Sequence, residues 1–297
     1  MWIFTTLLAL LSLQGTPEPA FRFGIVADVQ YADKDTAGKR HYRTSLERLK
    51  RCVGELNRHD LAFVVQLGDL IDEPGEENLA RVLAAWEPLK SPLRHVLGNH
   101  EFAAPGERGD VLRRLGLTSG DYDFRVGSWR FVVLDSVDVS LSGGWPEGHP
   151  NRQQASDWLA TLKESGNKNA QSWNGGLSER QTLWLEGVLS SARERDERVV
   201  VFSHLPLLEA ASSEWHLLWN HAEVVRRLES SGVVAAVFCG HDHAGGYAER
   251  DGIHHVTVNG MVEAPEKNAW GIVEVHADRL ELKGFGSQPS RTLPLRK

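Results

Sequence analysis

The sequence predicts a layered α/β fold, and three observations support this prediction. Apolar, strand-like runs recur along the chain, and segments with helical spacing of apolar residues separate them. The composition is typical of a globular protein, since 41% of the 297 residues are hydrophobic and 25% are charged. No internal repeat or low-complexity linker divides the chain. We therefore expect one domain over residues 21–297, preceded by a signal peptide at 1–20.

The predicted strands are short apolar runs that end in polar residues or turns. They are Phe21–Ala27, Leu61–Leu67, His95–Leu97, Val199–Phe202, Val233–Cys239, His254–Val258, Trp270–Val275 and Leu280–Gly284. Helices are predicted at Tyr42–Asn57, from the capping-box pattern Ser178-Glu179-Arg180-Gln181 through Val188, and near Leu217–Ser230. Strands and helices that alternate in this way favour mixed sheets covered by helices.

The segment 138–176 is predicted to be a long irregular connection. It contains Gly143-Gly144-Trp145-Pro146, Trp158, Trp173 and Gly175-Gly176. A long connection of this kind is often a binding loop or a lid. The alternative is a packed surface excursion whose tryptophans form a local core, and the sequence leaves both open.

Charge and cysteine content limit the classes of partner. The net charge is −7 and no long Lys/Arg run occurs, which argues against a nucleic-acid backbone as the main partner. An acidic chain needs local cations or metals to attract an anionic substrate. The two cysteines, Cys52 and Cys239, lie within apolar patterns, so we expect buried free thiols and no disulfide framework.

The N-terminal run Met1–Leu13 is mostly apolar and too short to span a bilayer, as in a secretory signal peptide. No Lys or Arg precedes this run, and neither Leu13-Gln14-Gly15 nor Glu18-Pro19-Ala20 is an ideal cleavage site. We expect export to the periplasm or medium, without stable insertion in a membrane. The alternative is a misassigned start or an apolar tail on a cytoplasmic protein.

Five segments end apolar runs with side chains that bind metals. They are Asp28-Val29-Gln30, Gly68-Asp69, Gly98-Asn99-His100-Glu101, Ser203-His204 and Gly240-His241-Asp242-His243. Each segment alone is a weak signal, because a lone histidine or turn aspartate is more often structural. All five in this order predict ligands for two metal ions about 3.5–4 Å apart, an arrangement that favours in-line attack on phosphorus.

The ligand types indicate which metals are suitable. Carboxylate, amide and imidazole ligands suit Mn²⁺, Fe and Zn²⁺, and the absence of thiolate argues against a structural zinc site. Asp69 lies on a Gly-Asp turn, where one carboxylate can bridge two ions. Gln30 is a weaker ligand than an imidazole, and its alternative role is that of a polar turn residue.

The residues beside the predicted ligands have less certain roles. His100 follows the ligand Asn99, so we expect it to contact phosphate and donate a proton to a leaving oxygen. Glu101 either orients His100 or is a solvated loop carboxylate. Arg43 is a candidate phosphate ligand or a helix-surface arginine, and Tyr247 is a candidate base-stacking residue or a strand-edge aromatic.

These motifs resemble the calcineurin-like metallophosphoesterase superfamily, whose pattern is D-x-H, G-D, G-N-H-E/D, H and G-H-x-H. The resemblance covers essentially Phe21 to the C-terminal strands. Gln30 stands where most members have histidine, and this Asp-x-Gln variant looks like the manganese-dependent ADP-ribose/CDP-alcohol diphosphatase branch. Further similar stretches are Phe23–Asp33, Tyr42–Leu46, Gln66–Asp69, Asn174–Ser178 and Gly240–Tyr247.

The resemblance implies a four-layer α/β sandwich with two central mixed sheets between helices. It implies one ion at Asp28, Gln30 and His243, a second at Asn99, His204 and His241, Asp69 as the bridge and His100 as the catalytic imidazole. It also implies hydrolysis of the pyrophosphate bond of ADP-ribose, CDP-alcohols or similar nucleotide diphosphates. In this reaction two divalent metal ions, expected to be Mn²⁺, activate the attacking water.

Two other functions remain open from the sequence. The nearer one is a broad phosphodiesterase or phosphomonoesterase of the same superfamily. The other is a non-catalytic metal-binding module, which a missing bridge or catalytic imidazole would favour, although Asp69 and His100 are both present. A nuclease is disfavoured because no basic stripe is visible, and the sequence carries no prediction of oligomeric state.

Overall fold

The computed structural model describes residues 18–73, 75–102 and 107–296, and within these ranges two mixed six-stranded sheets form the centre of the fold. In spatial order, the first sheet contains β14 (Arg291–Pro294), β13 (Arg279–Gly286), β12 (Ala269–Val275), β1 (Phe21–Val26), β2 (Phe63–Gln66) and β3 (Leu93–His95). The second contains β10 (Gly246–Arg250), β11 (Ile253–Thr257), β9 (Val234–Cys239), β8 (Arg198–Ser203), β5 (Trp129–Val133) and β4 (Tyr122–Val126). The predicted signal peptide falls largely on residues 1–17, which lie outside the described ranges.

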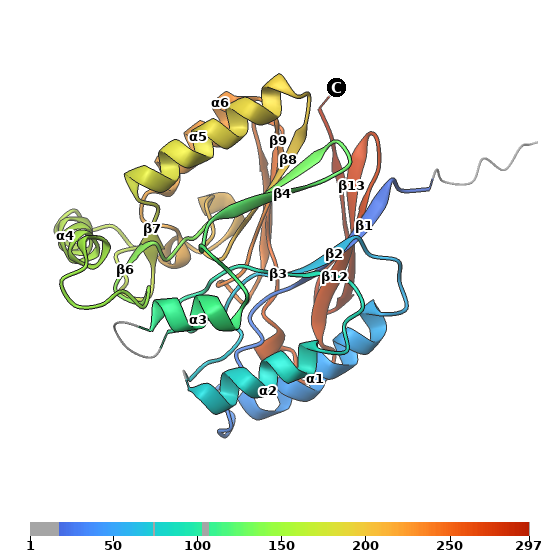
Figure 1. Ribbon diagram of the computed structural model, residues 1–297, viewed down its shortest axis with the longest axis horizontal. Helices are drawn as coiled ribbons and strands as arrows, with labels where there is room; N and C mark the ends of the chain where they lie inside the picture. Colours follow the sequence, from blue (N-terminus) through green and yellow to red (C-terminus); the bar gives the residue numbers. More distant parts are fainter. Residues whose placement is uncertain (1–17, 74, 103–106, 297) are drawn as a thin grey trace, which may run out of the picture.

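Helices cover the outer face of each sheet, as Figure 1 shows. Helices α1 (Tyr42–Leu56) and α2 (Glu76–Trp86) lie against the first sheet, and α5 (Glu179–Glu194) and α6 (His221–Ser231) lie against the second. The remaining elements are α3 (Arg108–Arg114), α4 (Pro150–Glu164), the short strands β6 (Val139–Ser140) and β7 (Gly175–Gly176), and the 3₁₀ turns η1 (Glu209–Ala211), η2 (Glu214–His216) and η3 (Met261–Glu263). The predicted helix–sheet–sheet–helix sandwich is confirmed.

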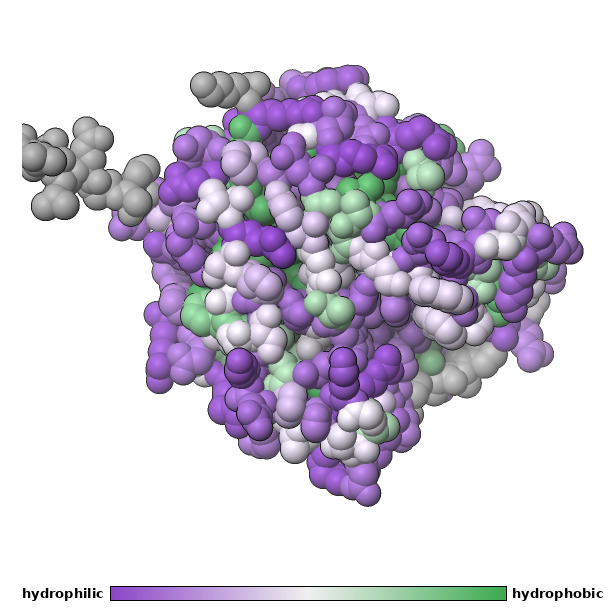
Figure 2. Space-filling model, turned by 180° about the vertical axis from the view of Figure 1, so that it is seen from behind, coloured by the Kyte–Doolittle hydropathy of each residue, from purple (hydrophilic) through white to green (hydrophobic). Residues whose placement is uncertain are grey.

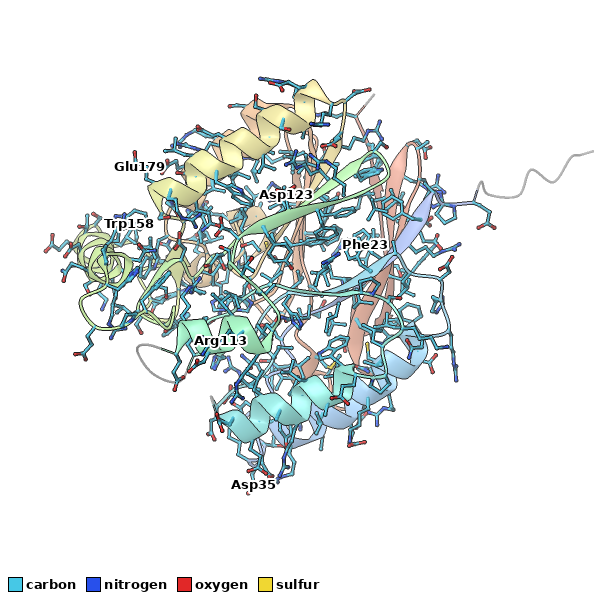
Figure 3. The ribbon with its side chains drawn as sticks, in the orientation of Figure 1. Phe23, Asp35, Arg113, Asp123, Trp158 and Glu179 are labelled. Atoms are coloured by element: carbon cyan, nitrogen blue, oxygen red, sulfur yellow. The ribbon has the colours of Figure 1, made fainter. Side chains whose placement is uncertain are left out.

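An aromatic core joins the two sheets. The Phe23 ring of β1 stacks on the Phe63 ring of β2, with centroids 4.9 Å apart. It also meets two rings of the second sheet edge-on, Phe131 at 5.6 Å and Phe202 at 5.9 Å. Figure 3 shows Phe23 between the sheets. Truncation of such a buried ring to alanine typically costs about 3–5 kcal/mol, so this cluster fixes how the two sheets face each other.

Parallel strand pairs bring the predicted ligand segments to one edge of the sandwich. Strand β1 runs parallel to β2, β2 to β3, and β8 to β9. The carboxyl ends of parallel strands lie on the same side of a sheet, and ligands commonly bind outside those ends. The loops that follow β1, β2, β8 and β9 therefore carry Asp28, Asp69, His204 and His241 toward one another.

Several predicted boundaries differ from the structure. The third predicted helix starts at His221, because the residues before it form a connection in which Leu217, Leu218 and Trp219 are buried. The third predicted strand ends at His95, where its pairing with β2 ends, so Val96 and Leu97 lie beyond it. The cap of α5 forms only in part: Ser178 Oγ accepts from Gln181 N at 3.3 Å. The Gln181 side chain instead pairs with the backbone of Asp135 in both directions, at 2.8 and 3.0 Å.

The segment 138–176 is not irregular throughout, because it contains α4 and the β6–β7 pair. Pro150 at the first turn and the His149 ring, which accepts from Asn151 N at 3.2 Å, begin α4. Its weak apolar pattern, with Ala155 and Leu159 as its buried residues, gave little helical signal. Trp158 packs in a local core with these residues, whereas Trp173 is 42% exposed.

Two further expectations can be compared with the described residues. Cys52 and Cys239 are both buried free thiols, which confirms the prediction. In the described part of the chain, no helix has the length and apolar character needed to cross a membrane. The face in Figure 2 is mainly hydrophilic, with apolar side chains in small separate areas.

Candidate metal centre

Four of the predicted ligands meet around one imidazole nitrogen. His204 Nε2 lies 3.2 Å from Asn99 Oδ1, 3.3 Å from Asp69 Oδ2 and 3.1 Å from His241 Nδ1. His204 is completely buried, and the other three side chains are at most 8% exposed. One proton on His204 Nε2 cannot satisfy three neighbouring acceptors at once, whereas a cation among the four atoms can. This donor set therefore fits a divalent metal ion.

Of the other three predicted ligands, Gln30 contacts Asp69, and Asp28 accepts from the backbone N–H of His241. Gln30 Nε2 lies 3.1 Å from Asp69 Oδ2, and His243 Nε2 lies 3.5 Å from Asp28 Oδ1. Gln30 Oε1 is buried and has no hydrogen-bond partner among the described residues, which is costly for an amide oxygen unless a cation satisfies it. The residues present therefore fit a second ion, with Asp69 between the two groups.

The outer nitrogen of each histidine has a hydrogen-bond acceptor. His204 Nδ1 donates to Leu67 O at 2.7 Å, His241 Nε2 to Asn174 Oδ1 at 3.0 Å, and His243 Nδ1 to Glu263 Oε1 at 3.1 Å. Each bond keeps a proton on the outer nitrogen, so the other nitrogen of each ring faces the centre. Such outer partners orient metal-binding imidazoles and raise their basicity.

The backbone of the centre is strained where the ligands are attached. Four of the seven candidate ligands have left-handed φ values: Asp28 (50°), Gln30 (41°), Asp69 (54°) and His241 (69°). For residues with a Cβ this conformation costs roughly 1–2 kcal/mol each, and such strain clusters at functional sites. The tertiary packing must therefore hold these turns in place.

Two glycines leave the space that the ligands need. A Cβ on Gly98 would lie 2.2 Å from Asp69 Oδ1, and one on Gly68, whose φ is +96°, would lie 2.5 Å from His204 Nδ1. Both glycines precede predicted ligands in the sequence. Their role is close approach, since any larger residue would displace the carboxylate or the imidazole.

Glu101 has neither of its two predicted roles. Its carboxylate is buried and accepts from Leu70 N at 2.6 Å and from Gly98 N at 2.7 Å. It therefore ties the loop of Asp69 to the loop of Asn99. Burial, followed by repulsion from Asp69, raises the pKa of this carboxyl to about 7, although the two backbone bonds oppose the shift.

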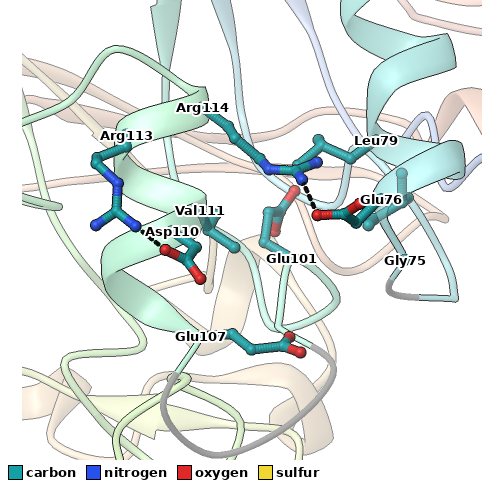
Figure 4. Close-up of a pocket in the computed structure, with 10 residues that line it drawn as sticks. Gly75, Glu76, Leu79, Glu101, Glu107, Asp110, Val111, Arg113 and Arg114 are labelled. Atoms are coloured by element: carbon teal, nitrogen blue, oxygen red, sulfur yellow. Dashed lines mark hydrogen bonds and ion pairs between the residues drawn. The ribbon is translucent and has the colours of Figure 1, made fainter.

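Glu101 also lines a separate cavity of about 320 Å³, shown in Figure 4. Arg113 and Arg114 at this cavity are ion-paired with Asp110 and Glu76. Its described lining carries more carboxylates than arginines, so it does not suit a phosphate group.

His100 lies beside the predicted ligands. Its backbone N–H donates to Asp69 Oδ1 at 3.0 Å, and its ring Nδ1 donates to the carbonyl oxygen of Asp72 at 2.8 Å. The second bond orients the ring and leaves Nε2 as the nitrogen free to meet a substrate. His100 is partly exposed, in contrast to the buried ligands.

A cavity of about 510 Å³ opens beside the centre. Predicted ligands and His100 form one part of its lining, and the other part comes from residues without a predicted role. The lining residues are Gln30, Arg40, Asp69, Asn99, His100, Phe102, Ser142, Trp173, His216, His241 and His243. Two of these residues, Ser142 and Trp173, belong to the segment 138–176, and Trp158 of the same segment packs in a local core.

Arg43 and Tyr247 do not line this cavity. Arg43 is 52% exposed and pairs with Asp33 and Asp35, each at 2.7 Å, and Figure 3 shows Asp35 at the outer margin of the molecule. Tyr247 stacks on His254, and its hydroxyl lies 3.1 Å from His254 Nδ1. Both residues thus have partners within the protein, and the structure favours the structural alternative for each.

Sequence reasoning did not identify Asn174, Glu263 and Arg40 as parts of the site. Asn174 was visible within a stretch similar to the family, next to Gly175-Gly176. Glu263 and Arg40 follow no strand-end pattern, so no signal in the sequence distinguished them from surface charges.

The charges of the centre favour cation binding. Burial lowers the pKa of His204, but Asp69 and the other nearby carboxylates outweigh it and raise the pKa to about 9. Burial opposes ionisation of Asp69, yet the charges of His204 and His100 hold its pKa well below the usual value. Without metal, the site thus holds a proton where a divalent ion can replace it.

Comparisons with known proteins agree with this geometry. The calcineurin-like phosphoesterase family model matches residues 21–245. The chain is 35% identical to a manganese-dependent ADP-ribose/CDP-alcohol diphosphatase of Xenopus tropicalis, over 93% of this chain and 94% of that one. It is 36% identical to a protein of the same name from Oryza sativa subsp. japonica, over 90% and 92%.

A solved structure shows the same fold. The crystal structure of a dimetal phosphatase from Danio rerio superposes with a TM-score of 0.86 and 31% identity, and covers 94% of this chain and 100% of that chain. These matches confirm the superfamily and the branch that the motifs predict. With its fold, strand-end ligands and sequence in agreement, this chain belongs to the calcineurin-like phosphoesterase family.

Proposed function

We propose that this protein is a manganese-dependent hydrolase that cleaves the pyrophosphate bond of ADP-ribose, CDP-alcohols or related nucleotide diphosphates. The observation that carries the proposal is the complete donor set around Asp69, with Gln30 in the position that distinguishes this branch. The relatives named for this activity align over at least 90% of the chain. The substrate is therefore a small nucleotide, not a nucleic acid.

The proposed roles follow from the contacts. Asp28, Gln30 and His243 would hold one ion, Asn99, His204 and His241 the other, and Asp69 would contact both. When bound, two such ions activate water and neutralise phosphoryl charge. His100 would place its Nε2 toward the leaving oxygen and supply a proton there, since the Asp72 carbonyl oxygen occupies Nδ1.

The test is a substrate panel with added Mn²⁺, read by product chromatography. We expect AMP and ribose 5-phosphate from ADP-ribose, and CMP from CDP-choline. Activity should disappear with a chelator and return best with Mn²⁺, because the donors are oxygen and nitrogen. Faster turnover of simple monoesters or diesters would support the broad-specificity alternative. Undiminished activity after verified removal of all metal would reject the mechanism.

We also propose that the protein is exported. Met1–Leu13 has the apolar character of a signal peptide, as described above. Mature protein should then begin between about Gln14 and Phe21, which N-terminal sequencing of protein isolated from its natural host would check. An intact N-terminus on cytoplasmic protein would reject export without affecting the proposed chemistry.

A further inference from the structure

We propose that Arg40 binds the second phosphate of a diphosphate substrate, the one that is not attacked. This inference rests on the proposed function and assigns a subsite within the cavity described above. Arg40 is the one arginine or lysine among the described residues that line that cavity. A diphosphate brings two charged groups to the site, and the metal ligands account for the binding of only one.

The backbone of Arg40 is held in a fixed position. Its N–H and carbonyl groups form a reciprocal pair with Ala37, at 3.0 and 3.1 Å. The next residue, His41, donates its N–H to Val262 O at 3.0 Å, and α1 begins directly after it. Arg40 is thus anchored to η3, the turn that carries Glu263, and its side chain starts from a rigid point.

The Arg40 guanidinium lies between the carboxylates of Asp72 and Glu263. Its Nη1 is 4.0 Å from Asp72 Oδ1, and its Nε is 3.9 Å from Glu263 Oε1. The main chain of Asp72 orients His100, and Glu263 orients His243. The cation is therefore placed next to the proposed proton donor on one side and next to a metal ligand on the other.

The Arg40 guanidinium donates no hydrogen bond to another described residue, so its donors are available to a substrate. Both ion-pair distances are too long for hydrogen bonds, and each carboxylate has a closer partner, Lys34 for Asp72 and His243 for Glu263. The Arg40 side chain is 41% exposed and faces the cavity. A planar guanidinium with free N–H groups binds phosphate oxygens in a bidentate manner.

Arg43 provides a matched control. It lies three residues away, is 52% exposed, and uses its guanidinium in hydrogen bonds to Asp33 and Asp35. Substitution of either arginine removes the same charge from the same region of the chain. A difference in nucleotide affinity between the two variants therefore reflects the position of the arginine in the cavity and not the loss of net charge.

The experiment measures equilibrium binding of ADP and AMP to the metal-loaded protein at fixed free Mn²⁺. We expect Arg40→Gln to weaken ADP binding by about 10–100-fold, the range for loss of a hydrogen bond to a charged group, and AMP binding by less than about threefold. Arg43→Gln should leave both affinities within about twofold. Metal content and the thermal midpoint should match those of the unsubstituted protein for both variants, and Arg40→Lys should restore part of the ADP affinity.

The outcomes separate the two proposals. Unchanged ADP binding in Arg40→Gln, equal weakening of ADP and AMP, or equal effects of the two arginines would overturn the assignment of Arg40. Failure of the unsubstituted protein to hydrolyse any nucleotide diphosphate would instead reject the proposed function. In that case the ratio of ADP to AMP affinities still decides whether Arg40 binds a second phosphate.

Discussion

The side-chain amide of Asn174 fixes the orientation of the His241 imidazole. Asn174 Oδ1 lies 3.0 Å from His241 Nε2, while Asn174 Nδ2 donates to Asn169 O at 3.0 Å and to Trp215 O at 2.8 Å. Because both amide protons are used, the oxygen must face the ring and accept its proton. His241 Nδ1 is thereby left unprotonated toward His204 and the centre.

Asn174→Ala should therefore weaken metal binding at the group formed by Asn99, His204 and His241. Loss of an outer partner of this kind costs roughly 10–100-fold in metal affinity or activity. Titration of the metal-free protein with Mn²⁺ measures the affinity, and saturating Mn²⁺ should restore most of the rate. Asn151→Ala is the control, since Asn151 binds Asp138 and does not touch the centre. A rate loss that added metal does not relieve would contradict this role.

Asp69→Asn should affect both metal groups together. Asp69 Oδ2 contacts both Gln30 and His204, one from each group, and an amide removes the negative charge between two dications. We expect a larger loss than the roughly 10–100-fold of an outer partner, with metal content reduced at both positions. Elemental analysis and circular dichroism measure metal and fold. Retention of two metals at a near-normal rate would show that Asp69 is not the bridge.

His100→Ala should reduce turnover by roughly 10²–10⁴-fold, the usual contribution of a positioned acid or base. Metal content should stay unchanged, because the ring of His100 bonds to the Asp72 carbonyl oxygen and not to a ligand. The loss should be smaller for aryl phosphodiesters, whose leaving groups need little protonation. Parallel loss of metal would make His100 a ligand, and an equal rate loss on all substrates would reduce its role to phosphate binding.

His255 should make the free energy of unfolding depend on pH. Burial, with Arg250 and His254 nearby, lowers its pKa from 6.5 to about 4, and neither ring nitrogen has a partner among the described residues. Between these two pH values only the unfolded chain takes up the proton. This group therefore does not reduce the free energy of unfolding above about pH 6.5, and reduces it increasingly as the pH drops toward 4. From pH 7 to pH 5 the loss from this group is roughly 2 kcal/mol.

His255→Phe should remove this contribution, so that urea denaturation at the two pH values shows a smaller difference than for the unsubstituted protein. His59→Phe provides the control, because it makes the same substitution at an exposed position. Equal pH dependence in the His255 variant and the unsubstituted protein would show that the buried ring is not the cause.

Local patterns predicted most of the elements, and they pointed to residues that the structure brings together. The helix at Tyr42 was visible because Leu46, Leu49, Val53 and Leu56 follow helical spacing. The structure buries the last three, and Leu46 is partly buried against the same core. Ligand residues were visible because they end apolar strands, and parallel pairing brings such ends together. The helix α4 was missed because its buried face is small, and the Ser178 cap formed only in part because Gln181 binds Asp135 instead.

The sequence by itself determined the layered fold, the order of the ligands and the choice of oxygen and nitrogen donors, since these depend on residue type and spacing along one strand and its turn. Only the tertiary structure decided which charges surround the centre. Asn174 reaches His241 across 67 positions of the chain, and Arg40, not Arg43, faces the cavity. Such contacts depend on how loops of distant elements pack together, and no local periodicity records that packing.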